Sequence, residues 1–188
     1  KKPHQKDGGL KMLSGNIGKC VAQISAVKKQ FRYINAKTLV FDDQEEVKKA
    51  YEKGKLNRNV IIVVRNQGPK ANGMPELHSL TPMLSNVQDL GFKVALLTDG
   101  RMSGASGKIL AAIHVTPEAI DNGVIGKIED DDEIEIDANN GKLNILTDIS
   151  KRNNSLLNDM KKNQSFGRNI FNTLRTVSYT HLTLPTRS

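Results

Sequence analysis

Residues 93–108 read KVALLTDGRMSGASGK, an apolar run that ends abruptly in Thr-Asp-Gly and continues as a loop of small and polar residues. The apolar run is typical of a strand buried on both faces. A second run of this kind, NVIIVV at 59–64, is followed by its own glycine- and proline-rich segment, QGPKANGMPELHSLTP at 67–82, which we expect to be a loop. Neighbouring buried strands bring their carboxyl ends together, and ligands bind at that edge of open α/β sheets. The two loops are therefore predicted to meet.

The segments around these strands predict the rest of the fold. Short apolar and β-branched runs at 20–27 and 36–42 indicate further strands. Residues 42–56 and 80–91 have helical patterns that stop at a glycine or just beyond one.

The chain changes character after residue 122. Residues 123–148 alternate isoleucine and leucine with polar residues around Asn-Asn-Gly-Lys, which predicts an antiparallel hairpin with one wet face. A polar helix is expected over 148–163. Together these elements predict a mixed α/β fold, built on a closed or strongly curved sheet with flanking helices.

Composition excludes several classes of protein. The 188 residues include one cysteine, Cys20, so a disulfide framework and a four-cysteine metal site within the chain are both excluded, and a reducing, cytoplasmic location is expected. No apolar segment approaches the roughly 20 residues of a membrane helix. The net charge of +8 suggests an anionic partner, but acidic clusters interrupt the lysines and only 4% of residues are aromatic. We therefore predict a small anionic substrate rather than nucleic acid or a membrane.

The two ends of the chain are expected to differ from its middle. Residues 1–14 are polar and rich in lysine and glycine and are predicted to be a linker from a missing preceding domain, with the domain itself at 15–175. Residues 176–188 end in VSYTHLTLPTRS, which resembles a translated sequencing adapter and is excluded from the fold prediction.

Candidate site residues gather in the two loops. Glu76 and His78 belong to the first loop. The second loop contributes Asp99, Arg101, Ser103, Ser106 and Lys108, and His114 follows it. A carboxylate facing a serine and two cations could hold a metal ion and an oxyanion, with glycines letting backbone N–H groups approach. The alternatives are a purely structural turn or, less consistent with the sequence, a nucleophile elbow; the spacing does not fit a Walker loop.

Longer motifs carry a family resemblance. TDGRMSGASGK at 98–108 and AAIHVTPEA at 111–119, with SGNIGK at 14–19, GPKANGMPELHSLTP at 68–82 and GRNIFNTLR at 167–175, resemble the family of dihydroxy-acid and 6-phosphogluconate dehydratases. These motifs are most similar to those of the phosphogluconate branch of that family. The resemblance covers roughly the C-terminal third of such an enzyme.

This resemblance implies a β-barrel-like, swivelling β/β/α domain that closes over an N-terminal domain carrying an iron–sulfur cluster and most magnesium ligands. It implies that Glu76 is a magnesium ligand and Ser103 the catalytic base. The weaker expectations are substrate contacts by Asp99, Arg101, Ser106, Lys108 and His78. Cys20 matches no cluster-ligand motif, so no iron–sulfur ligand is expected in this chain.

The implied reaction is the dehydration of 6-phospho-D-gluconate to 2-dehydro-3-deoxy-6-phospho-D-gluconate, by a complete enzyme that is a homodimer. The fragment alone is expected to be inactive. Two alternatives stay open: a dihydroxy-acid or other sugar-acid dehydratase fragment, and an anion-binding domain without catalysis.

Overall fold

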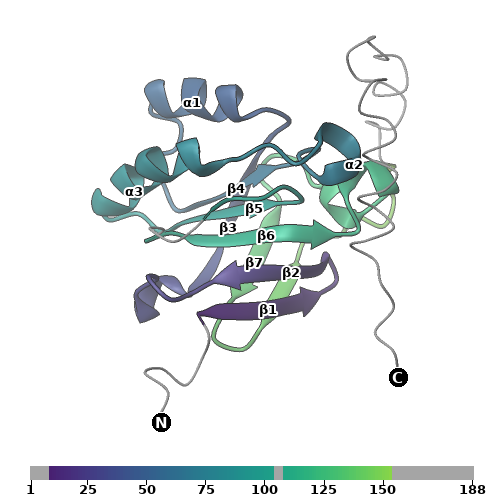
Figure 1. Cartoon of the computed structure of the whole chain (residues 1–188), viewed down its shortest axis with the longest axis horizontal. Helices are drawn as coiled ribbons and strands as arrows, with labels where there is room; N and C mark the ends of the chain where they lie inside the picture. The colour runs from purple at the N-terminus through teal and green to yellow at the C-terminus, as the bar shows by residue number, and fades with distance from the viewer. Residues whose placement is uncertain (1–8, 104–107, 154–188) are drawn as a thin grey trace.

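A closed barrel of eight strands forms the centre of the computed structural model, which describes residues 9–103 and 108–153 (Figure 1). The strands are β1 (Leu10–Gly15), β2 (Gly18–Gln23), β3 (Tyr33–Phe41), β4 (Val60–Val64), β5 (Val94–Thr98), β6 (Leu110–Thr116), β7 (Glu133–Asp137) and β8 (Lys142–Ile145). Their order around the barrel is β1-β2-β6-β5-β4-β3-β7-β8. The predicted mixed fold on a closed sheet is confirmed.

The two apolar runs are the neighbouring parallel strands β4 and β5, and every residue of both is buried. Ile61, Val63, Ala95 and Leu97 point into the barrel, whereas Ile62 and Leu96 belong to a second cluster outside it. Both faces are covered, and this explains why the runs show no alternation of apolar and polar residues.

Helices cover the outer face of these strands. In Figure 1, α1 (Gln44–Glu52) and α3 (Thr81–Asp89) lie together on one side of the barrel, opposite β1 and β2. Helix α1 begins where Asp43 accepts a 2.7 Å hydrogen bond from the backbone N–H of Glu45, which satisfies a donor of the first turn. The short helix α2 (Pro69–Asn72) and four 3-10 helices complete the described elements; the 3-10 helices are Lys29–Phe31, His78–Leu80, Ala119–Asp121 and Val124–Lys127.

The predicted hairpin is β7 and β8, with Ile134 opposite Ile145 and Ile136 opposite Leu143. All four side chains are buried in the barrel core. Gly141 has φ +74°, a left-handed conformation that glycine adopts without steric cost, so the Asn-Gly turn signal is confirmed.

Four expectations need correction. Residues 10–14, assigned to a linker, form most of β1, which pairs with β2 along its whole length. Strand β6 is not among the expected strands, since its sequence, LAAIHVT, contains two alanines, a residue type depleted in strands. The segment 67–82 is not loop throughout, since it contains α2 (Pro69–Asn72) and the 3-10 helix His78–Leu80. The expected helix over 148–163 is absent from its described part, 148–153, where the chain turns; residues 154–163 and the tail 176–188 lie outside the described residues.

Among the described residues, we find no helix whose length and apolar character would let it span a membrane.

Candidate functional site

The two loops meet at the carboxyl ends of β4 and β5, as predicted. Glu76 and Arg101 form a parallel β-bridge, and the N–H of Leu77 donates to the carbonyl oxygen of Arg101 at 3.1 Å. These contacts hold the first loop along the second, although Leu77 and Arg101 are 24 residues apart along the chain.

The carboxylate of Glu76 is the polar centre of this junction. Its Oε1 accepts the backbone N–H of Ser103 at 2.7 Å and that of His78 at 3.1 Å. Its Oε2 lies 3.5 Å from a guanidinium nitrogen of Arg101. The side chain of Glu76 is 34% exposed, so its lone pairs are also open to a ligand from solvent.

Ser103, Arg101 and His78 are held around this carboxylate. Nδ1 of His78 lies 2.8 Å from the carbonyl oxygen of Ser103, and Nε of Arg101 donates to the carbonyl oxygen of Met74 at 2.9 Å. Ser103 is exposed. The structure therefore brings together four of the predicted residues: Glu76, His78, Arg101 and Ser103.

Asp99 lies beneath the junction and is 1% exposed. Its carboxylate accepts backbone N–H groups from Asn66 at 3.1 Å, Gln67 at 2.9 Å and Ala119 at 3.1 Å. Burial raises the pKa of Asp99, and these hydrogen bonds oppose that rise. Asp99 thus joins the ends of β4, β5 and β6, a positioning role that sequence reasoning did not assign to it.

The other two predicted residues of the second loop, Lys108 and Ser106, are not placed at this junction by any described contact. Lys108 is exposed, and its carbonyl oxygen lies 3.4 Å from the side-chain nitrogen of Gln88. Ser106 lies outside the described residues.

Glu118 is a buried carboxylate that sequence reasoning missed. It is 8% exposed and accepts the backbone N–H groups of Lys70, at 3.2 Å, and Ala71, at 3.3 Å, in the first turn of α2. A Cβ on Gly68 would lie 2.3 Å from its Oε2, so only glycine leaves room for this approach. Burial, with a smaller contribution from Asp99 and Asp121, raises the pKa of Glu118 to about 7. The Pro-Glu of the motif AAIHVTPEA was its sequence signal.

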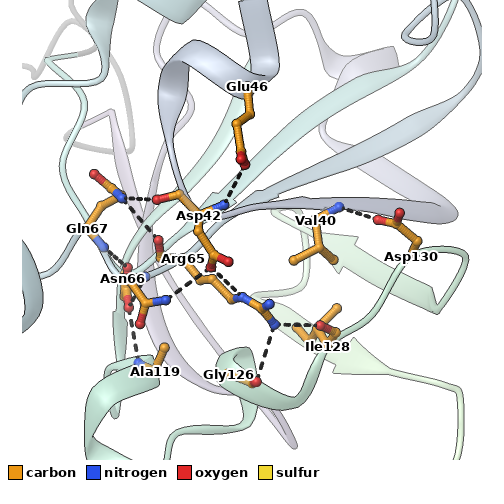
Figure 2. Close-up of polar contacts among 11 residues, drawn as sticks. Val40, Asp42, Glu46, Arg65, Asn66, Gln67, Ala119, Gly126, Ile128 and Asp130 are labelled. Carbon is orange, nitrogen blue, oxygen red and sulfur yellow. Dashed lines mark hydrogen bonds and ion pairs between the residues drawn. The ribbon is translucent and has the colours of Figure 1, made fainter. Parts of the chain in front are cut away.

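A second missed network braces the end of β4, and Figure 2 shows it. Arg65 donates to the carbonyl oxygens of Gly126 and Ile128 and to the carboxylate of Asp42. That carboxylate also accepts the amide of Asn66, at 3.0 Å. Since Asn66 begins the segment that leads to Glu76, this network fixes the origin of the first loop.

The donor set can be tested against a metal ion. Among residues 9–103 and 108–153, no three His, Cys, Asp or Glu side chains converge in a way that could hold one. Mg²⁺ is often bound by only one or two carboxylates, with water or substrate oxygens completing its shell. Glu76 therefore fits the role of a single oxygen ligand at the edge of a site completed by other groups.

Comparison with known proteins shows which family the chain resembles over most of its length. Residues 1–180 match the family model described as dihydroxy-acid/6-phosphogluconate dehydratase C-terminal. The chain is similar to phosphogluconate dehydratase of Rhizobium meliloti, with 58% identity over 78% of this chain and 24% of that protein. It is 48% identical to that of Helicobacter pylori over 92% of this chain and 30% of the relative, and 42% identical to dihydroxy-acid dehydratase of Campylobacter lari over 73% and 25%. The chain thus spans about a quarter of the length of these relatives.

Proposed function

The chain belongs to the dihydroxy-acid/6-phosphogluconate dehydratase family, and we propose that it is the C-terminal part of a phosphogluconate dehydratase. The complete enzyme would convert 6-phospho-D-gluconate to 2-dehydro-3-deoxy-6-phospho-D-gluconate. The observation that carries this proposal is the hydrogen bond between the N–H of Ser103 and the carboxylate of Glu76, which joins the two loops at the carboxyl ends of β4 and β5. Relatives named phosphogluconate dehydratase reach 58% identity, against 42% for the dihydroxy-acid dehydratase, which favours the phosphogluconate branch.

We assign Ser103 as the base that takes the C2 proton of the substrate. A serine hydroxyl is a very weak acid, so its ionised form needs nearby positive charge. Arg101, held at the same junction by Glu76 and by the carbonyl oxygen of Met74, supplies such a charge. The hydrogen bond from the N–H of Ser103 to Glu76 fixes the backbone that carries the hydroxyl.

We assign Glu76 as one ligand of a magnesium ion. When bound, the metal would stabilise the negative charge that develops on the substrate oxygens. Within this domain, the carboxylate of Glu76 accepts hydrogen bonds from the N–H groups of Ser103 and His78. These bonds keep the proposed base, Ser103, at a constant separation from the proposed metal ligand, Glu76.

The iron–sulfur ligands would lie outside this chain. Cys20 is 2% exposed and packs in the barrel interior, and burial raises the pKa of its thiol to about 12. A thiolate is the form that binds iron, so Cys20 is unsuited to that role. A cytoplasmic homodimer, with this domain closing over an N-terminal domain, completes the proposal.

The test is Ser103→Ala in the complete enzyme that carries this domain. Turnover of 6-phosphogluconate should fall by about 10²–10⁴-fold, the usual loss when a general base is removed, with the iron–sulfur absorption spectrum unchanged. Ser14→Ala, the same chemical change at an exposed position of β1, is the matched control and should keep full activity. Retained turnover in Ser103→Ala would show that another group is the base.

Two further outcomes separate the alternatives. If a branched dihydroxy acid were dehydrated and 6-phosphogluconate were not, the chain would belong to the dihydroxy-acid branch. If the complete protein dehydrated neither but still bound sugar acids, the domain would be an anion-binding module.

A further inference from the structure

Strand β6 contains one extra residue relative to β2, the strand with which it pairs. Lys19 of β2 pairs with Thr116 and Val21 pairs with Ile113, so two steps along β2 face three steps along β6. The surplus is a β-bulge, a device that redirects a side chain and is common beside active sites. Within it, His114 has φ +57°, a left-handed conformation that is unfavourable for a residue with a Cβ.

The bulge takes the side chain of His114 out of the barrel. Regular alternation would follow Ala112, inside the barrel, and Ile113, outside it, with an inward residue at 114. Instead Val115 occupies the inward position, and His114 is exposed. Without the extra residue, the imidazole would enter an apolar core and lose its hydration.

The redirected residue lies against the second loop of the site. The N–H of His114 donates to the carbonyl oxygen of Gly100 at 2.9 Å, one residue before Arg101. Desolvation and the positive charge of Arg101 lower the pKa of His114 below its ordinary value. The imidazole is therefore mostly neutral at pH 7, with one nitrogen that donates and one that accepts.

Arg101 can donate further hydrogen bonds to a ligand that also contacts His114. Its described contacts are to the carbonyl oxygen of Met74 and to Glu76, whereas a guanidinium carries five N–H donors. The side chain of Arg101 is 51% exposed, so part of its guanidinium group is open to a ligand from solvent. An anion between the two side chains would receive hydrogen bonds from both.

We propose that His114 and Arg101 together bind an oxyanion of the substrate, its phosphate or its carboxylate. This inference rests on the proposed function for the identity of the substrate, but the geometry of the pair does not depend on it. The bulge would then exist to place a second donor beside Arg101, at the strand ends that carry Ser103.

Nuclear magnetic resonance on the 188-residue chain tests binding directly. The ring signals of His114 are assigned by their loss in His114→Asn and followed at constant pH during addition of inorganic phosphate, gluconate and 6-phosphogluconate. Saturable shifts with phosphate and 6-phosphogluconate but not gluconate identify the phosphate end; equal shifts with gluconate identify the carboxylate. If none of the three produces a saturable shift at millimolar concentration, the proposal is wrong.

Kinetics of the complete enzyme give the second readout. Asparagine tolerates the left-handed conformation, so His114→Asn removes the imidazole and keeps the bulge. We expect KM for 6-phosphogluconate to rise by about tenfold or more, the usual effect of losing one hydrogen bond to a charged group, with a smaller change in kcat. His114→Gly should behave in the same way, and an unchanged KM in both variants would overturn the proposal.

The two failures are distinguishable. If the wild-type enzyme does not turn over 6-phosphogluconate, the proposed function fails, and the resonance shifts of His114 alone decide the oxyanion site. If the wild type is active and the His114 variants match it, only the oxyanion site fails.

Discussion

The replacement Glu118→Gln should remove a defined part of the pH dependence of folding. Glu118 is buried and its pKa in the folded chain is about 7, against 4.5 when it is exposed. A folded state with the higher pKa binds the proton more tightly than the unfolded chain does. Stability from this group is therefore complete below pH 4.5 and is lost as pH rises towards 7.

The expected loss follows from that difference. At about 1.4 kcal/mol for each pH unit, ionisation of Glu118 costs about 3 kcal/mol of unfolding free energy by pH 8. Glutamine matches the protonated form in size and charge, and its carbonyl oxygen can accept the N–H groups of Lys70 and Ala71. The variant should equal the wild type near pH 4 and exceed it by about 3 kcal/mol at pH 8.

Urea denaturation of the 188-residue chain, followed by circular dichroism between pH 4 and 8, measures this difference. Subtracting the two curves cancels the contributions of groups that do not interact with Glu118, so the difference contains the ionisation of Glu118 together with its coupling to Asp99 and Asp121. Parallel curves for wild type and variant would refute the reasoning, because they would show that Glu118 ionises in the folded chain as easily as in the unfolded one.

Two other measurements check the structure. Asp99→Asn replaces one acceptor oxygen by a donor that faces a backbone N–H, so unfolding free energy at pH 7 should fall by about 1–3 kcal/mol in urea denaturation; an unchanged midpoint would contradict the three hydrogen bonds. Cys20 should resist a thiol reagent in the native chain at pH 8 and react in denaturant, because its thiol is buried and its pKa is about 12; rapid native labelling would place it outside the barrel core.

The parts of the fold that could be predicted are those with a local pattern. The runs at 60–64 and 94–98 contain nothing but buried residues, and the hairpin shows alternation around an Asn-Gly turn. Strand β1 could not be predicted in this way, because Leu10 and Met12 are exposed and Leu13 alone of its six residues is buried. Only its pairing with β2 and β8 makes it a strand.

In the candidate site, too, some residues could be predicted from local sequence and others could not. Glu76 and Ser103 could be nominated because they lie in loops that follow buried strands and because the motifs of those loops resemble the family's, and parallel pairing predicted that the two loops meet. The functions of Asp99 and Glu118 in holding the loops could not be predicted from the sequence, because each carboxylate accepts hydrogen bonds from backbone N–H groups more than 15 residues away. Nothing in the local sequence marks such partners.

The sequence by itself determined which segments bury both faces, where the polar loops begin and which family the motifs resemble, because these depend on residue type and on spacing within a few residues. Tertiary structure alone decided that the sheet closes with β1, that Asp99 and Glu118 fasten the loops from beneath, and that a bulge turns His114 out of the barrel. Those features depend on register between strands that are distant in sequence, and register is set by the packing of the whole barrel.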